Sequence, residues 1–129
     1  SVGEVPKGEE TVLVVDDDEA ILTIAARILN RLGYDPHPTS NAEEAITMVA
    51  GGLRPALLIS DLALSIGTGI TLWEELKKTI PGLQALFTSG YDDRKAIKTT
   101  PPDGLQILDK PYTPRELAMK VRFLLDGER

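Results

Sequence analysis

Short apolar runs alternate with segments of helical periodicity along this chain of 129 residues. Four of the runs have the length and the continuous hydrophobicity of buried strands, namely 11–15, 56–59, 83–87 and 105–108. A parallel sheet produces this pattern, because helices cover both of its faces and leave its strands no polar side. A fifth, poorer strand is expected at 34–38, where two prolines remove ladder donors and predict an edge position.

The segments between the first three strands carry helix signals. The first predicted helix has apolar residues spaced along one face and ends at Gly33, a residue suited to helix termini. The second begins at Ser40 or Asn41, because either side chain can cap a helix, with Glu43 or Glu44 as its capping-box partner. Both connections are therefore predicted to be helical crossovers.

The second half of the chain repeats the alternation. A third helix is expected from about 69–79, and the last begins at Thr113, with Pro114 as its first residue and Glu116 completing a capping box. The segment 91–102 predicts a fourth helix that two consecutive prolines cut short. Five strands and five helices in alternation indicate an α/β fold with a doubly wound five-stranded parallel sheet.

Length and composition limit what such a chain can be. Residues 1–10 are expected to be a linker, 11–127 a single domain and 128–129 a tail. The chain begins with Ser, which suggests either a piece of a longer protein or removal of Met. No apolar run approaches the roughly 20 residues that span a bilayer, so no membrane insertion is expected.

Net charge and cysteine content exclude some classes of function. The net charge of -6, with no clustered basic stretch, argues against direct nucleic-acid binding. The absence of cysteine excludes disulfides, thiolate nucleophiles and Cys-based metal sites, and it fits a cytoplasmic location. Any metal is therefore expected to have oxygen ligands.

Acidic residues follow two of the predicted strands at the ends where open α/β sheets bind ligands. Asp16 and Asp17 follow the first strand, and Asp61 follows the third. Three carboxylates in one crevice repel one another unless a cation is present, and Mg²⁺ suits such oxygen ligands. For Asp18 and Glu19 we prefer a simpler interpretation, in which they cap the first helix and interact with its dipole.

The fourth and fifth strands end in other reactive groups at the same edge. Thr88 supplies a hydroxyl, and Lys110 supplies an ammonium group. Either residue alone is an ordinary turn residue. A carboxylate nucleophile, two metal-binding acids, a hydroxyl and a cation together are what phosphoryl transfer requires, since positioning and charge neutralisation supply most of its catalysis.

Four short segments carry a family resemblance. In order and spacing, 14–18, 58–61, 88–91 and 110–112 resemble the signature segments of the response-regulator receiver family. The resemblance covers about residues 10–126 and is greatest to the C-terminal receivers of hybrid sensor histidine kinases. It implies a flavodoxin-like (βα)5 fold with strand order 2-1-3-4-5.

The resemblance also implies a Mg²⁺ site and a phosphoacceptor. Asp61 would accept the phosphoryl group and also bind the metal. Asp17 would be a direct Mg²⁺ ligand, Asp16 a ligand directly or through water, and the Ala63 carbonyl a further ligand. No organic cofactor is implied.

Two further residues and the partners follow from the same resemblance. Lys110 would pair with a phosphoryl oxygen, and Thr88 would hydrogen-bond another as the switch residue. The donor would be a histidine kinase or a histidine-phosphotransfer domain, and the chain would be a monomer or a weak dimer. The protein would be a signalling domain rather than an enzyme, apart from catalysing its own phosphorylation and dephosphorylation.

The chain departs from the family pattern at three places. Leu64 and Ser65 stand where the family often has Met-Pro, so a more mobile loop and a looser metal site are expected. Ile107 stands where a Tyr or Phe commonly rotates inward on activation. We expect the loops 62–69 and 88–93 to respond to phosphorylation more than 105–120. The prolines of the fourth helix also alter a face that many receivers use for output.

Three alternatives remain open. A phosphatase with an Asp nucleophile would use Asp16 and Asp18, but it leaves Asp61 unexplained and needs a larger chain. A degenerate receiver that binds partners without phosphorylation is weakly favoured by Ser65 and Ile107, although all four segments are intact. A flavin-binding module would need a phosphate loop after the first strand, where the acidic run would repel phosphate.

Overall fold

A computed structural model of the chain describes residues 5–90 and 105–127. Its centre is a sheet of five parallel strands, as the apolar pattern predicted, in the order β2-β1-β3-β4-β5 that the resemblance implied. The expected fourth helix at 91–102 lies outside the described residues. The strands are β1 (Thr11–Val15), β2 (Asp35–Thr39), β3 (Leu57–Asp61), β4 (Gln84–Ser89) and β5 (Gln106–Asp109).

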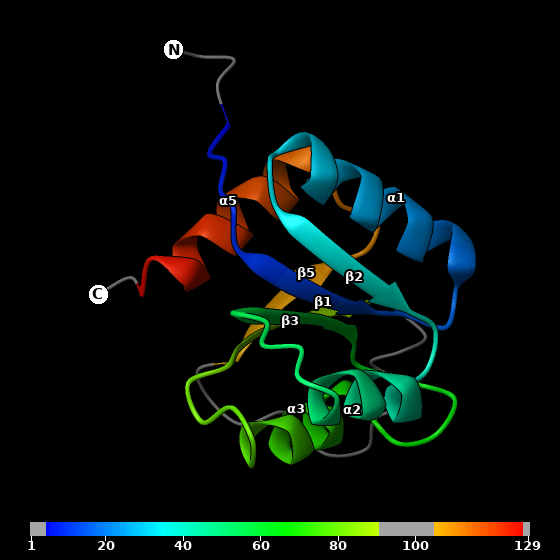
Figure 1. Cartoon of the computed structure of the whole chain (residues 1–129). Coiled ribbons are helices and arrows are strands. Elements are labelled where there is room, and N and C mark those ends of the chain that lie inside the picture. Colours follow the sequence, from blue (N-terminus) through cyan, green and yellow to red (C-terminus); the bar gives the residue numbers. More distant parts are fainter. Residues whose placement is uncertain (1–4, 91–104, 128–129) are drawn as a thin grey trace.

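Helices cover both faces of this sheet (Figure 1). Helices α1 and α5 lie on one face, and α2 and α3 lie on the other. Each layer therefore has its own hydrophobic core. The helices are α1 (Glu19–Arg31), α2 (Ala42–Ala50), α3 (Gly69–Lys77) and α5 (Pro114–Leu125).

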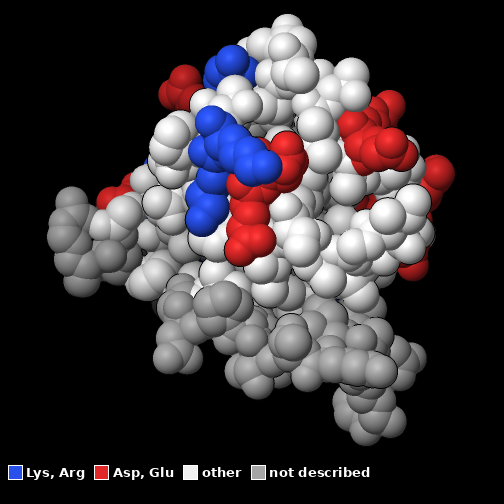
Figure 2. All heavy atoms as spheres, turned by 90° about the horizontal axis from the view of Figure 1, so that it is seen from below, with Lys and Arg blue, Asp and Glu red and all other residues white. Residues whose placement is uncertain are grey.

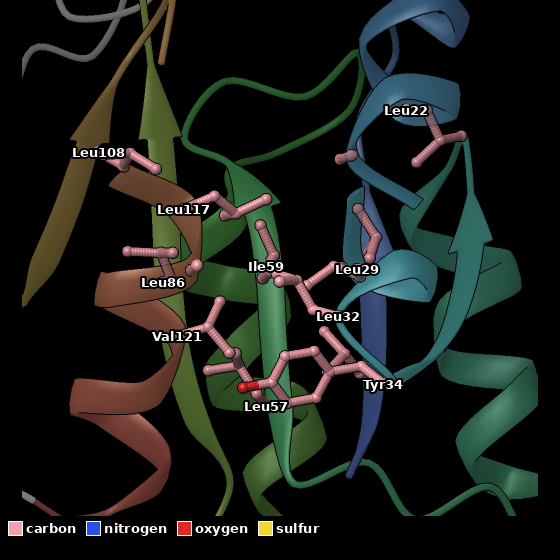
Figure 3. Close-up of a cluster of buried hydrophobic side chains, with 14 residues drawn as sticks. Leu22, Leu29, Leu32, Tyr34, Leu57, Ile59, Leu86, Leu108, Leu117 and Val121 are labelled. Atoms are coloured by element: carbon pink, nitrogen blue, oxygen red, sulfur yellow. The ribbon is translucent and has the colours of Figure 1, made fainter. Parts of the chain in front are cut away.

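Alternate residues of β1 and β3 supply the two cores. Val12 and Val14 face α1 and α5, whereas Leu13 and Val15 face α2 and α3. This alternation follows from the pleat of the strand, and it explains why the runs are apolar at every position. Figure 3 shows the larger core, in which Ile59 and Leu86 of the sheet meet helix side chains such as Leu29, Leu117 and Val121.

The predicted caps set the helix boundaries. The Asp18 carboxylate accepts hydrogen bonds from the backbone N–H groups at the start of α1, and Asn41 caps α2. Thr113 and Glu116 form the expected capping box of α5. The prediction for α2 was wrong in one respect: the Glu44 side chain accepts a hydrogen bond from the Thr39 hydroxyl instead of completing a capping box.

Strands β3 and β4 run two residues farther than the apolar pattern predicted. Their polar ends continue the ladder, in which Ser60 pairs with Phe87 and Asp61 with Thr88. Backbone hydrogen bonding does not depend on side-chain polarity, so hydrophobicity alone could not show this extension. Asp61 therefore lies on a rigid strand next to Thr88.

The segment before β1, expected to be a linker, contacts the domain from Val5 onward, because Val5 packs against the larger core. The Gly8 N–H donates to the Leu32 carbonyl at 3.1 Å. The Arg122 guanidinium of α5 donates to Glu10 through both amino groups, at 3.2 and 2.8 Å, and to the Lys7 carbonyl at 3.1 Å. These contacts fasten the segment to α5 at the amino end of the sheet.

We expect Arg122→Met to lower the free energy of unfolding by about 1–2 kcal/mol, because it removes a bidentate ion pair and a bond to a backbone carbonyl. The hydrogen bond from Arg122 holds the pKa of Glu10 below its ordinary value. A carboxyl with a lowered pKa stabilises the fold at neutral pH and loses that contribution as the pH falls from its unfolded to its folded pKa. The difference between wild type and variant should therefore shrink in acid.

Urea unfolding at several pH values checks this prediction. Arg27→Met, at an exposed position on α1, is the control and should change the free energy of unfolding by less than about 0.5 kcal/mol. A difference that stays constant down to acidic pH would contradict the role given to Glu10.

The surface carries charges of both signs. On the face shown in Figure 2, basic and acidic side chains lie side by side. Lys78 pairs with Glu75 at 2.9 Å, and the Lys77 amine lies over the Trp73 ring. Within the described ranges no helix is both long and apolar enough to cross a bilayer.

Candidate phosphorylation site

Two buried carboxylates meet one amine at the carboxyl end of the sheet. Asp16 directly follows β1, Asp61 ends β3, and Lys110 directly follows β5. The Lys110 Nζ lies 2.9 Å from Asp61 Oδ2 and 3.2 Å from Asp16 Oδ2. Asp16 and Asp61 are only 4% and 6% exposed, so this amine neutralises charges that water screens poorly.

The other oxygen of each carboxylate accepts a hydrogen bond from the backbone. Asp16 Oδ1 accepts from the Asp18 N–H at 2.9 Å, and Asp61 Oδ1 accepts from the Ala63 N–H at 3.3 Å. Burial lowers the pKa of Lys110, but the hydrogen bond to Asp61 and the charge of Asp16 outweigh burial and raise it above its ordinary value. Lys110 is therefore a fixed cation in this pocket.

Asp17 points elsewhere. This exposed residue accepts a hydrogen bond from the Ser65 hydroxyl, with 2.7 Å between Ser65 Oγ and Asp17 Oδ2. Over residues 5–90 and 105–127, no three acidic or histidine side chains stand close enough together to hold a metal ion. Asp16 and Asp61 therefore converge as expected. Asp17 does not join them and instead accepts its hydrogen bond from the Ser65 hydroxyl.

The donor set nevertheless fits Mg²⁺ in its chemistry. Three carboxylates and the Ala63 carbonyl are all oxygen donors, which Mg²⁺ takes together with water. Asp16 and Asp61 already bring two carboxylates to a single cationic atom. Asp17 would have to turn to join them.

Thr88 lies next to Asp61, and Ile107 lies on the adjacent strand β5. Thr88 is buried on β4 next to Asp61, and its carbonyl accepts a hydrogen bond from the Leu62 N–H at 2.9 Å. Ile107 on β5 pairs with Phe87 and packs against the buried cluster that contains Leu62 and Phe87. Ile107 is therefore part of a packed core.

The segment after Lys110 lines a hollow next to the pocket of Asp16 and Asp61. The Lys110-Pro111 peptide bond is cis. Pro111 and Tyr112 line a hollow of about 380 Å³ together with Ile21 and Ile24 of α1. Sequence reasoning did not identify Tyr112 or the two isoleucines as neighbours of the site, because the hollow forms only when α1 packs beside this segment.

Gly69 explains how α3 approaches the pocket. A Cβ atom at this position would lie 2.5 Å from the Asp61 carbonyl oxygen and 2.8 Å from Ser60 Oγ. The Gly69 N–H donates to the Leu62 carbonyl at 2.9 Å. Only a residue without a side chain lets α3 begin this close to the end of β3.

The family model described as "Response regulator receiver domain" matches residues 12–122. The chain belongs to the response regulator receiver family. Such receivers are domains of two-component signalling, and the fold and strand order described above are theirs.

Relatives of this receiver include much longer proteins. The sensor kinase CckA of Brucella abortus is 31% identical over 123 residues, which cover 94% of this chain and 13% of that protein. The DNA-binding transcriptional regulator NtrC of Azospirillum brasilense is 32% identical over 118 residues, covering 91% of this chain and 24% of that protein. The receiver thus spans a quarter or less of the length of these two relatives.

Solved structures agree with this assignment. The receiver domain of the hybrid histidine kinase CckA has a TM-score of 0.74 and 28% identity, with 89% of this chain and 98% of that chain covered. A receiver protein from Sinorhizobium medicae, at 23% identity, has a TM-score of 0.79 and covers 94% of this chain and 98% of that chain, which supports the fold alone. The expected likeness to a hybrid-kinase receiver is confirmed.

Proposed function

We propose that this receiver accepts a phosphoryl group from a phosphohistidine onto Asp61 in a Mg²⁺-dependent reaction. The observation that carries the proposal is the position of the Lys110 amine between Asp16 and Asp61. It places a fixed positive charge beside a buried carboxylate at the ligand-binding edge of a doubly wound sheet. Charge neutralisation of this kind is the main requirement of phosphoryl transfer.

Each residue of the site would have a separate role in the reaction. A carboxylate oxygen of Asp61 attacks phosphorus, the P–N bond to the donor imidazole breaks, and the bonding electrons leave with the imidazole. Lys110 would stabilise the negative charge on a phosphoryl oxygen, and the Thr88 hydroxyl would donate a hydrogen bond to another. Mg²⁺, held by Asp16, Asp17, Asp61 and the Ala63 carbonyl, would supply further charge neutralisation.

The surroundings support a protein donor. The hollow lined by Ile21, Ile24 and Tyr112 adjoins Lys110, and Ile24 is 55% exposed. An apolar surface next to the reactive carboxylate suits a helical partner that presents a histidine. We propose a histidine kinase or a histidine-phosphotransfer domain as that partner, which implies a cytoplasmic setting.

A direct test uses the chain with Mg²⁺ and acetyl phosphate. Intact mass spectrometry should show the addition of one phosphoryl group, and fragmentation should place it on Asp61. Addition should require Mg²⁺ and be lost with EDTA. No addition from acetyl phosphate or from a phosphorylated histidine-phosphotransfer domain would favour the degenerate receiver instead.

A further inference from the structure

Ser65 links the loop after β3 to the acidic run after β1. Its hydroxyl donates a hydrogen bond to Asp17 Oδ2 at 2.7 Å. We propose that Ser65 is a latch that holds Asp17 out of the acidic pocket and thereby lowers the affinity of the receiver for Mg²⁺. This inference rests on the proposed function, because it concerns the same metal site.

The arrangement of the carboxylates supports the latch. Asp16 and Asp61 already meet at Lys110, and Asp17 is the expected ligand that is absent from this cluster. For all three carboxylates to bind one ion, Asp17 must leave Ser65, or the loop must move together with it. In the first case, removing the hydroxyl should strengthen Mg²⁺ binding. In the second case, removing it should weaken Mg²⁺ binding.

The loop itself favours the first case. The Leu64 N–H donates to the Gly67 carbonyl at 3.3 Å, and Ala63 and Thr68 form a β-bridge across the turn. Gly67 has a φ of 80°, a left-handed conformation that suits glycine and closes the turn. Ser65 therefore lies within a turn closed by its own backbone, so moving Ser65 together with Asp17 would disturb these contacts.

The size of the effect follows from the strength of one hydrogen bond. A hydroxyl bonded to an exposed carboxylate favours the latched state about fivefold, which is near the middle of the range for single hydrogen bonds. The apparent affinity for a ligand equals the intrinsic affinity multiplied by the fraction of protein in the binding-competent state, which here is the state with Asp17 released. The latch should therefore weaken Mg²⁺ binding about fivefold.

The family pattern gives a matched comparison. The receivers that this chain resembles often have proline at the position of Ser65, and proline has no hydroxyl to donate. The latch is thus a property of this chain and separable from the metal site itself. Substitutions at position 65 change no proposed ligand side chain.

Isothermal titration calorimetry with Mg²⁺ alone tests the proposal on the whole chain. Ser65→Ala should bind Mg²⁺ about fivefold more tightly than wild type, whereas Ser65→Thr keeps the hydroxyl and should stay close to wild type. Ser40→Ala, at the turn between β2 and α2, is the control and should leave the affinity unchanged. With acetyl phosphate, Ser65→Ala should need about fivefold less Mg²⁺ for half-maximal phosphorylation, with the rate at saturating Mg²⁺ unchanged.

Each result decides between the two proposals. Equal or weaker binding by Ser65→Ala, with Mg²⁺ bound normally by wild type, overturns the latch alone. Tighter binding by the variant without phosphorylation of either protein supports the latch and overturns the proposed function. A wild-type chain that binds no Mg²⁺ overturns both.

Discussion

Substituting Asp61 by Asn should abolish phosphoryl uptake from acetyl phosphate, because the amide oxygen is not a competent nucleophile. The fold should survive. Loss of the charge relieves repulsion with Asp16 but removes a counter-charge of Lys110. The Asn oxygen can still accept a hydrogen bond from the amine. These effects oppose one another, so the free energy of unfolding should change by less than about 1 kcal/mol.

Intact mass and urea unfolding measure the two parts of this prediction. Asp18→Asn is the matched control, because asparagine caps a helix as well as aspartate does. That variant should take up phosphoryl groups like wild type. Uptake by Asp61→Asn at the wild-type level would show that another carboxylate is the acceptor, and the assignment of Asp61 would be wrong.

Replacing Lys110 by Met should have the largest effect on stability. Without the amine, the buried carboxylates of Asp16 and Asp61 lose the cation that they share. Removing one partner from a buried ion pair typically costs about 3 kcal/mol or more. We expect a loss of about 3 kcal/mol in EDTA, and we expect millimolar Mg²⁺ to restore much of it because the ion replaces the missing charge.

Urea unfolding with EDTA and with Mg²⁺ separates these contributions. Lys78→Met removes an exposed lysine paired with Glu75 and should change the free energy of unfolding by less than about 0.5 kcal/mol in either buffer. If Lys110→Met is equally unstable in both buffers, Mg²⁺ does not bind near Asp16 and Asp61. Phosphorylation of this variant should be much slower than that of wild type at every Mg²⁺ concentration.

Periodicity and caps predicted most of the fold. The strand pattern gave the doubly wound sheet with β2 at its edge, and Asp18, Asn41 and Thr113 marked helix starts correctly. The ends of β3 and β4 were predicted too early, because polar residues at a strand end give no hydrophobic signal. Strand existence follows from side-chain burial, whereas strand length depends on backbone pairing between chain segments distant in sequence.

The sequence predicted which residues meet at the site better than it predicted the contacts between them. Asp16, Asp61 and Lys110 each follow or end a strand, so the topology alone brings them to one edge. The Asp17 carboxylate accepts a hydrogen bond from Ser65, which is 48 residues away in sequence. Ser65 appeared in the sequence only as a departure from a family pattern, and no local signal connects it to Asp17.

The attachment of the segment before β1 bears on how such a domain is joined to others. Lys7 and Glu10 are held by Arg122 at the amino end of the sheet, and the end of α5 lies on that side as well (Figure 1). The pocket of Asp61 lies at the opposite end. A neighbouring domain connected through either of these points would be tethered away from the pocket and would leave its entrance open. This geometry suits a domain that forms part of a longer protein, as the matching regions of CckA and NtrC do.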